Sequence, residues 1–144
     1  MVEKDTIRLL RECDAGVKMG VKSMDEVIDY MHSENFRQIL INYKSEHTKL
    51  GNEIQTLLDN YHDEGKNPNP VAAGMSWVKT NMKLAVDESD QTIADLMTDG
   101  CHMGIKSLNR YLNQYESADE KSRDIARKLI HLEEELVADI REYL

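Results

Sequence analysis

The hexapeptide MGVKSM at residues 19–24 returns almost unchanged as MGIKSL at residues 103–108, which lie 84 positions further along the chain. The same shift relates Gly16 to Gly100. Beyond these segments the shift becomes 86, and further identical residues coincide. We interpret the chain as two copies of one unit; the alternative is a chance likeness between amphipathic helices. The residues that the second shift relates are Glu34 and Glu120, Ile39 and Ile125, Leu50 and Leu136, Ile54 and Ile140, and Leu58 and Leu144.

Apolar residues around these stretches recur at alternating intervals of three and four, which is typical of helices packed in an antiparallel bundle. The pattern predicts long helices over residues 5–32, 34–62, 90–115 and 117–144. Only short turns separate the first helix from the second and the third from the fourth, so each pair is expected to form an antiparallel hairpin. The predicted fold class is therefore all-α, an up-down four-helix bundle in a single domain over residues 1–144.

A crossover over residues 63–89 separates the first hairpin, residues 5–62, from the second, residues 90–144. It opens with the polar, Gly- and Pro-containing linker DEGKNPN, after which the pattern predicts a short fifth helix over residues 71–86. In a bundle of two equivalent hairpins, the second and third long helices run the same way and need such a crossover. We expect Trp77 and its neighbouring methionines to dock this helix on the bundle, and a partner-binding surface is the alternative.

Short polar side chains stand where the long helices are expected to begin. Asp5 and Ser33 each precede a run of helical periodicity, and a short side-chain oxygen at such a position accepts a hydrogen bond from a free amide of the first turn. Ser117 is followed three residues later by Glu120, which is the capping-box pattern. These residues therefore predict the starts of the first, second and fourth helices.

The composition narrows the function classes. With 7 Gly and 2 Pro in 144 residues, the chain has too few turn-forming residues for an all-β fold. A formal charge of −9 argues against nucleic acid as a partner, because an acidic surface repels phosphate. No apolar run is long enough for a membrane span or a signal peptide, so we expect a cytoplasmic protein without a membrane partner. Cys13 and Cys101 show no metal or redox spacing and are interpreted as small core residues.

The two repeated hairpins and the long crossover resemble the ferritin-like superfamily over essentially the whole chain. Within it, the chain resembles a small bacterial family that is described only as a domain of unknown function. The resemblance implies a fold and no reaction. The segments that carry it are ECDAGVKMGVKSMDEV from residue 12, SEHTKLGNEIQTLL to residue 58, the crossover stretch VAAGMSWVKTNMKLAV, and MTDGCHMGIKSLNRYL from residue 97.

Ferritin-like di-iron proteins bind their metals with one Glu from each of two helices and a Glu-x-x-His pair from each of the other two. The spacing matters because residues three apart lie on one helix face and reach the same metal pair. No Glu-x-x-His occurs in this sequence, since Lys49 and Thr56 stand where Glu46 and Glu53 would need a histidine. We therefore expect no di-iron centre of that kind.

Some polar residues nevertheless fall in the apolar stripes. Asp14 and His47 are in the stripes themselves, and Glu133 coincides with His47 at the shift of 86. Counted from the tight turns, His102 is level with Glu133. One hypothesis is a single metal ion, Fe, Mn or Zn; the alternative is a His–Glu hydrogen bond or ion pair at the edge of the core, without metal. The candidate metal ligands are His102, His131, Glu133 and Glu134.

Four glycines recur at equivalent positions of the first and third helices. Gly16 and Gly20 correspond to Gly100 and Gly104, and within each pair the glycines are four residues apart on one face. Glycine inside a helix costs about 1 kcal/mol relative to alanine, so the repetition suggests a use. We expect the first and third helices to approach closely at these faces; simple avoidance of overpacking is the alternative.

These observations favour a non-enzymatic, cytoplasmic structural or protein-interaction module, which could form a homo-oligomer through its helix faces. The second hypothesis is a metal-binding or metal-oxidase relative of the ferritins with altered ligands. The third is a carrier that holds a small ligand between the hairpins, because bundle interiors accommodate ligands.

Overall fold

The chain is described by a computed structural model in which residues 4–67 and 89–144 are placed. These residues form four α-helices and a short 3₁₀-helix, and they contain no strand. The predicted all-α class is confirmed, whereas the predicted fifth helix and the Trp77 surface lie outside the described residues. The helices are α1 (Lys4–Ile28), α2 (Glu34–Asn60), α6 (Asp90–Gln114), α7 (Glu120–Ile140) and η1 (Arg141–Tyr143).

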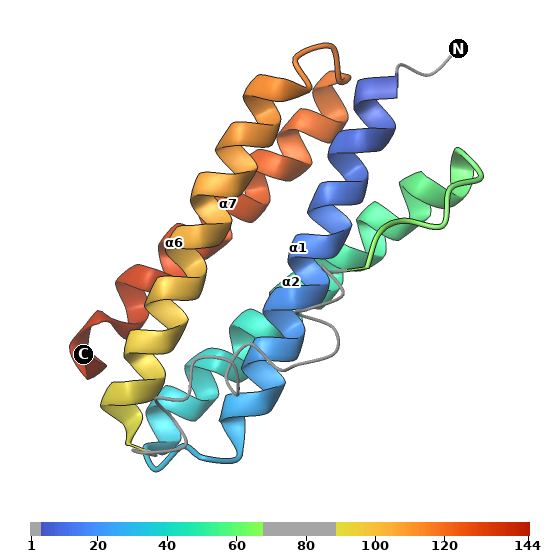
Figure 1. The fold of residues 1–144 in the computed structure, drawn as a ribbon. Coiled ribbons are helices and arrows are strands. Elements are labelled where there is room, and N and C mark those ends of the chain that lie inside the picture. The colour runs from blue at the N-terminus through green and yellow to red at the C-terminus, as the bar shows by residue number, and fades with distance from the viewer. Residues whose placement is uncertain (1–3, 68–88) are drawn as a thin grey trace.

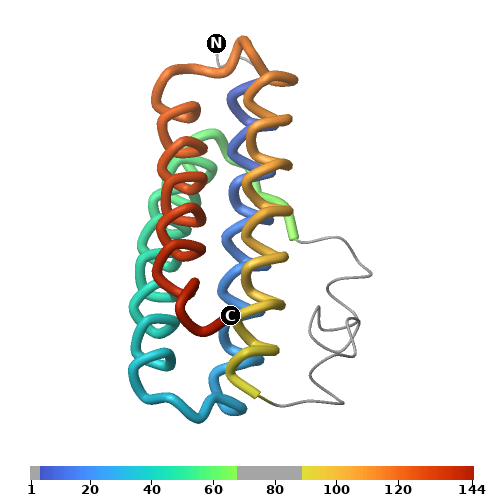
Figure 2. Tube along the Cα trace, turned by 90° about the vertical axis from the view of Figure 1, so that its left-hand side faces the viewer, coloured from blue at the N-terminus to red at the C-terminus, as the bar shows by residue number. Residues whose placement is uncertain are grey.

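The four long helices pack side by side as two antiparallel hairpins (Figures 1 and 2). One hairpin is α1 with α2 and the other is α6 with α7; α1 also packs against α6 and α7, and α2 packs against α7. Since α2 and α6 run in the same direction, the chain has to return along the bundle between Asn60 and Asp90 (Figure 1). Because α1 belongs to the first hairpin and α6 to the second, the long face that these two helices share lies where the hairpins meet.

Polar side chains set the ends of the helices. Ser33 caps α2 as predicted, its hydroxyl accepting from the Phe36 amide at 3.2 Å. The capping box predicted at Ser117 is wrong, because α7 begins at Glu120 and Asp119 is its N-cap, accepting from the Ser122 amide at 2.8 Å. The preceding turn is instead held to another helix, α1.

Two residues in the first turn of α1 hold the turn between α6 and α7. Asp5 lies inside α1, so its predicted N-cap role is wrong; its carboxylate accepts from the Ser117 amide at 3.1 Å. The Thr6 hydroxyl accepts from the Asp119 amide at 2.8 Å. The amides of this turn therefore donate to side chains of α1, and α7 does not extend back to Ser117.

At the other end of the bundle, α1 stops at Ile28, four residues before the predicted end. The Asp90 carboxylate at the start of α6 accepts from the His32 amide at 2.9 Å and from the Ser33 amide at 2.8 Å. These two amides face an acceptor outside α1, so the segment between α1 and α2 turns instead of continuing as helix.

The apolar core consists of two clusters stacked along the bundle, and both cysteines are buried within them as expected. Between the clusters lies a layer that contains the buried His47 and the half-buried Glu133. The first cluster includes Leu9, Leu10, Cys13, Val17, Leu50, Ile54, Leu58, Leu108, Leu112, Ile125 and Leu129. The second includes Met24, Val27, Phe36, Leu40, Ile93, Leu96, Met97, Cys101, Leu136 and Ile140.

Candidate functional site

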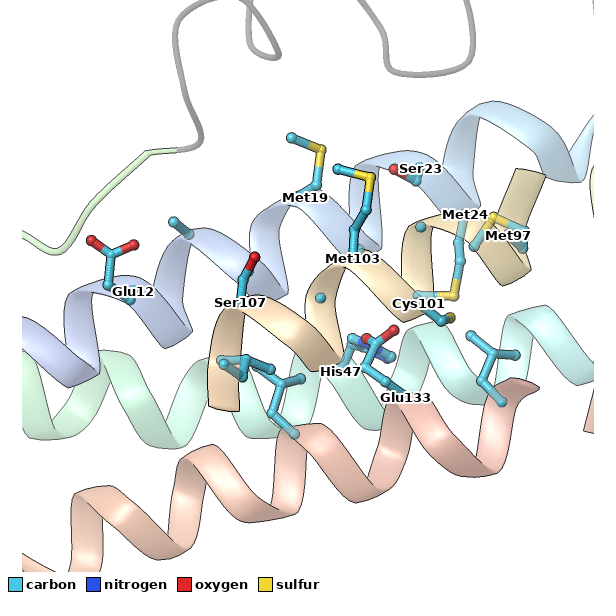
Figure 3. A pocket seen from close by; sticks show the side chains of 18 of the residues that line it. Glu12, Met19, Ser23, Met24, His47, Met97, Cys101, Met103, Ser107 and Glu133 are labelled. Atoms are coloured by element: carbon cyan, nitrogen blue, oxygen red, sulfur yellow. The ribbon is translucent and has the colours of Figure 1, made fainter. Parts of the chain in front are cut away.

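A partly enclosed cavity of about 630 Å³ lies along the face shared by α1 and α6, beside the layer that separates the two core clusters (Figure 3). Its lining is mainly apolar, with side chains from α1 and α6 at its sides and from α2 and α7 at its floor. We call it the α1–α6 cavity. Its lining includes Glu12, Gly16, Met19, Gly20, Ser23, Met24, His47, Lys66, Met97, Gly100, Cys101, Met103, Gly104, Ser107, Leu108, Tyr111, Leu129, Glu133 and Leu136.

The four repeated glycines all line this cavity. A Cβ atom at Gly104 would meet no described residue within 4 Å outside its own helix turn, and one at Gly20 would meet His47 of α2, 3.1 Å away. The predicted close approach of the first and third helices at these two positions is therefore wrong. The close contact occurs instead at Gly51 of α2, where a Cβ would lie 2.9 Å from Val17 Cγ1. Among the described residues, none occupies the position that a side chain at Gly104 would take.

The floor of the cavity contains a hydrogen-bonded pair of side chains from α2 and α7. His47 Nε2 lies 2.6 Å from Glu133 Oε1, and His47 Nδ1 lies 2.7 Å from the Tyr43 carbonyl oxygen. The His47 side chain is 0% exposed and that of Glu133 is 12% exposed. Because a carbonyl oxygen can only accept, Nδ1 carries a proton, and a protonated Nε2 donates to the carboxylate.

The electrostatics of this pair favour the imidazolium. Burial by itself lowers the pKa of His47. The hydrogen bond and the negative charge of Glu133, together with the Tyr43 carbonyl, outweigh burial, so the net pKa of His47 is raised. The result is a His47–Glu133 ion pair that is satisfied on both ring nitrogens.

Cys101 of α6 also lies close to Glu133. Burial raises the pKa of the Cys101 thiol, and the charge and the hydrogen-bond acceptor of Glu133 raise it further. The thiol therefore stays protonated at neutral pH and is not a nucleophile. Glu133 thus pairs with His47 of α2 while its carboxylate points toward the cavity (Figure 3).

A second carboxylate, that of Glu12 on α1, also lines the cavity, apart from Glu133 (Figure 3). Lys66 Nζ lies 2.5 Å from Glu12 Oε1, and this hydrogen bond raises the pKa of Lys66. Tyr111 lies near the same carboxylate; burial first, and then the charge of Glu12, raise the pKa of Tyr111. The cavity therefore has one carboxylate on its floor, that of Glu133, and a second, that of Glu12, which is paired with Lys66.

Asp14, the acidic residue in the stripe of the first helix, anchors the chain after α2. Its side chain is buried, and its Oδ2 accepts from Lys18 Nζ at 2.8 Å and from the Lys66 amide at 2.9 Å. Gly65, next to this amide, has a φ of 85° and would place a Cβ 2.4 Å from Asp14 Oδ2. Asp14 is thus explained by backbone anchoring and does not contact the His47–Glu133 pair.

The four candidate metal ligands do not converge. His102 and Glu134 are exposed. His131 is also exposed, with Nε2 2.5 Å from Glu135 Oε1, while Glu133 points inward to His47. Over residues 4–67 and 89–144, no group of three or more His, Cys, Asp or Glu side chains is arranged to hold a metal ion. The single-metal hypothesis stays a prediction.

Sequence reasoning singled out His47 and Glu133 but missed Cys101 as their neighbour. The repeated glycines could have indicated this neighbour, because they lie on the same helix faces as Cys101 and line the cavity with it. None of the helices in the described part of the chain has the length and apolar content needed to cross a membrane. Comparison with protein-family models, with curated proteins and with solved structures finds no significant match for this chain.

Proposed function

We propose that this chain is a ferritin-like, non-enzymatic helical protein that binds a small, predominantly apolar molecule in the α1–α6 cavity. The ferritin-like assignment is supported by the two antiparallel hairpins and by the common direction of α2 and α6, which calls for a long crossover. The repeat, the fifth helix and a cytoplasmic location belong to the same proposal and come from the sequence.

The observation that carries the proposal is the cavity itself. Its volume of about 630 Å³ falls within the range of roughly 300–1,000 Å³ that is typical of small-molecule sites. Four methionines line it: Met19 and Met24 from α1, and Met97 and Met103 from α6. Methionine side chains are flexible and polarisable, and they adapt to the shapes of apolar ligands. An interior site between helices is also where bundles hold their ligands.

The polar groups at the floor support binding rather than catalysis. A general base needs a nitrogen that can reach substrate, and both His47 nitrogens are already held, by Glu133 and by Tyr43. A nucleophilic cysteine needs a lowered pKa, and that of Cys101 is raised. These groups therefore orient a ligand and limit its polarity.

The proposal is tested by native mass spectrometry of the purified protein, with identification of small molecules released on denaturation. Gly104→Leu should place a side chain in the cavity, because Gly104 lines it and no described residue lies within 4 Å of the new Cβ. We expect this variant to fold and to lose the bound molecule. Lys106→Leu is the matched control on the exposed face of α6 and should retain it. Equal ligand content in both variants, or none in the native protein together with no response to apolar probes, would overturn the proposal.

A further inference from the structure

We infer that the ligand of the α1–α6 cavity carries an ammonium group, which pairs with Glu133, on an otherwise apolar body. This inference rests on the proposed function and adds the chemical class of the molecule. It comes from the distribution of charge around the cavity and from the acceptor capacity that remains on Glu133.

Glu133 retains room for a ligand donor. An ionised carboxylate has two oxygens with about four lone-pair positions in total. His47 Nε2 uses one of these positions on Oε1, 2.6 Å away. The side chain is 12% exposed and points toward the cavity (Figure 3). A further donor can therefore approach from the cavity side.

The cationic side chains that line the cavity, His47 and Lys66, are each paired with a carboxylate. His47 lines the cavity floor beside Glu133, but its side chain is 0% exposed and its Nε2 is paired with that carboxylate. Lys66 is 47% exposed and is engaged by Glu12 at the far end. The formal charge of −9 on the whole chain adds a field of the same sign. An anionic head group beside Glu133 would be repelled by its ionised carboxylate.

The remainder of the lining favours an apolar body. Met24 and Cys101 belong to the second core cluster, and Leu108 and Leu129 to the first, so the wall continues the apolar core on both sides of the polar layer. A hydrophobic monoamine matches this arrangement: its tail replaces water along the methionines, and its ammonium forms a charge-assisted hydrogen bond to Glu133.

The experiment compares three probes that share one tail: octylamine, octanol and octanoate, titrated into the purified protein at pH 7 by calorimetry. A charge-assisted hydrogen bond contributes roughly 1.5–3 kcal/mol, so octylamine should bind at least about tenfold more tightly than octanol. Octanoate should bind most weakly. Glu133→Gln should remove the preference for the amine while retaining octanol binding, and Glu134→Gln, an exposed neighbour on α7, should leave both unchanged.

The outcomes separate the two proposals. If octylamine and octanol bind equally, or if octanoate binds best, the ammonium inference is overturned while the apolar site stands. If none of the probes binds, the proposed function itself fails. Should Glu133→Gln not fold, the ranking of the three probes on the native protein still decides, and octylamine affinity that does not fall between 0.05 M and 0.5 M salt contradicts pairing with a partly exposed carboxylate.

Discussion

His47 Nε2 lies 2.6 Å from Glu133 Oε1, although the two residues are 86 positions apart, which is the shift that relates the second and fourth long helices in the predicted repeat. The contact joins α2 to α7 across the middle of the bundle. It also interrupts the apolar core, whose two clusters end on either side of it. Two residues that the shift of 86 relates are thus in contact with each other at the floor of the cavity.

Removing one partner of this pair should destabilise the fold more than removing both. Glu133→Ala leaves the His47 ring buried beside no carboxylate, and breaking a buried ion pair in this way costs about 3 kcal/mol of unfolding free energy. The double variant His47→Leu/Glu133→Met replaces both groups by apolar side chains of similar size, and we expect it to recover most of that loss. Urea denaturation followed by circular dichroism measures the four corners of the cycle, with Glu134→Ala as the exposed control. Additive losses in the double variant would contradict the pairing.

The stability contributed by the pair should depend on pH in one direction. The pKa of His47 is raised in the folded protein, so the folded state holds this proton more tightly than the unfolded state does. The stabilisation is fully present below the unfolded pKa of about 6.5 and is lost as the pH rises through the folded pKa. The groups that set this behaviour are Glu133 and the Tyr43 carbonyl, and the neutral Cys101 thiol lies close to Glu133.

The measurement is the urea midpoint between pH 6 and pH 9 for the native chain and for His47→Leu. The difference between the two proteins should shrink as the pH rises. A difference that grows over this range would show that His47 is buried in its neutral form.

The sequence anticipated the helices better than the site, and α6 shows why. Helix faces follow from apolar periodicity, so the ends of α2 and α6 were predicted to within two residues. Counting from the tight turns places His102 at the same height along the bundle as Glu133. Height along the bundle does not determine which way a side chain points around its helix. Consecutive residues of an α-helix point about 100° apart. Cys101 therefore faces Glu133, whereas His102 is exposed.

Replacing a helix glycine by alanine should lower the melting temperature where another side chain is close to the glycine, and raise it where none is. At Gly51 a Cβ would lie 2.9 Å from Val17 Cγ1, so Gly51→Ala should lower the melting temperature. At Gly104 the added methyl meets no described residue within 4 Å, and at Gly16 it meets Leu129 at an ordinary 3.7 Å. Alanine is favoured over glycine in a helix by about 1 kcal/mol, so these two variants should melt higher than the native chain. Thermal melts followed by circular dichroism check all three, and a lower melting temperature for Gly104→Ala would contradict the open space at that position.

The anchoring role of Asp14 predicts a local change in backbone dynamics. Asp14→Ala removes the acceptor of the Lys66 amide and leaves Lys18 without its carboxylate partner. Loss of such buried hydrogen bonds costs about 1–3 kcal/mol, and hydrogen exchange at the Lys66 amide should accelerate in proportion. Asp29→Ala, at an exposed position just after α1, is the control and should leave this amide protected. Unchanged exchange at Lys66 in Asp14→Ala would show that the segment is held by Arg11 and Asp63 alone.

The metal hypothesis makes a separate prediction, because its candidate ligands already have other partners. Glu133 is held by His47, and His131 faces Glu135 on the same exposed side of α7. A metal ion that used Glu133 together with His131 would have to break both contacts and turn one side chain by a large angle around the helix. We therefore expect less than one equivalent of Fe, Mn or Zn in protein purified without chelator or affinity tag, measured by plasma mass spectrometry. A full equivalent that is lost in His131→Ala and in Glu133→Ala, but kept in His32→Ala, would instead establish the altered-ligand metal site.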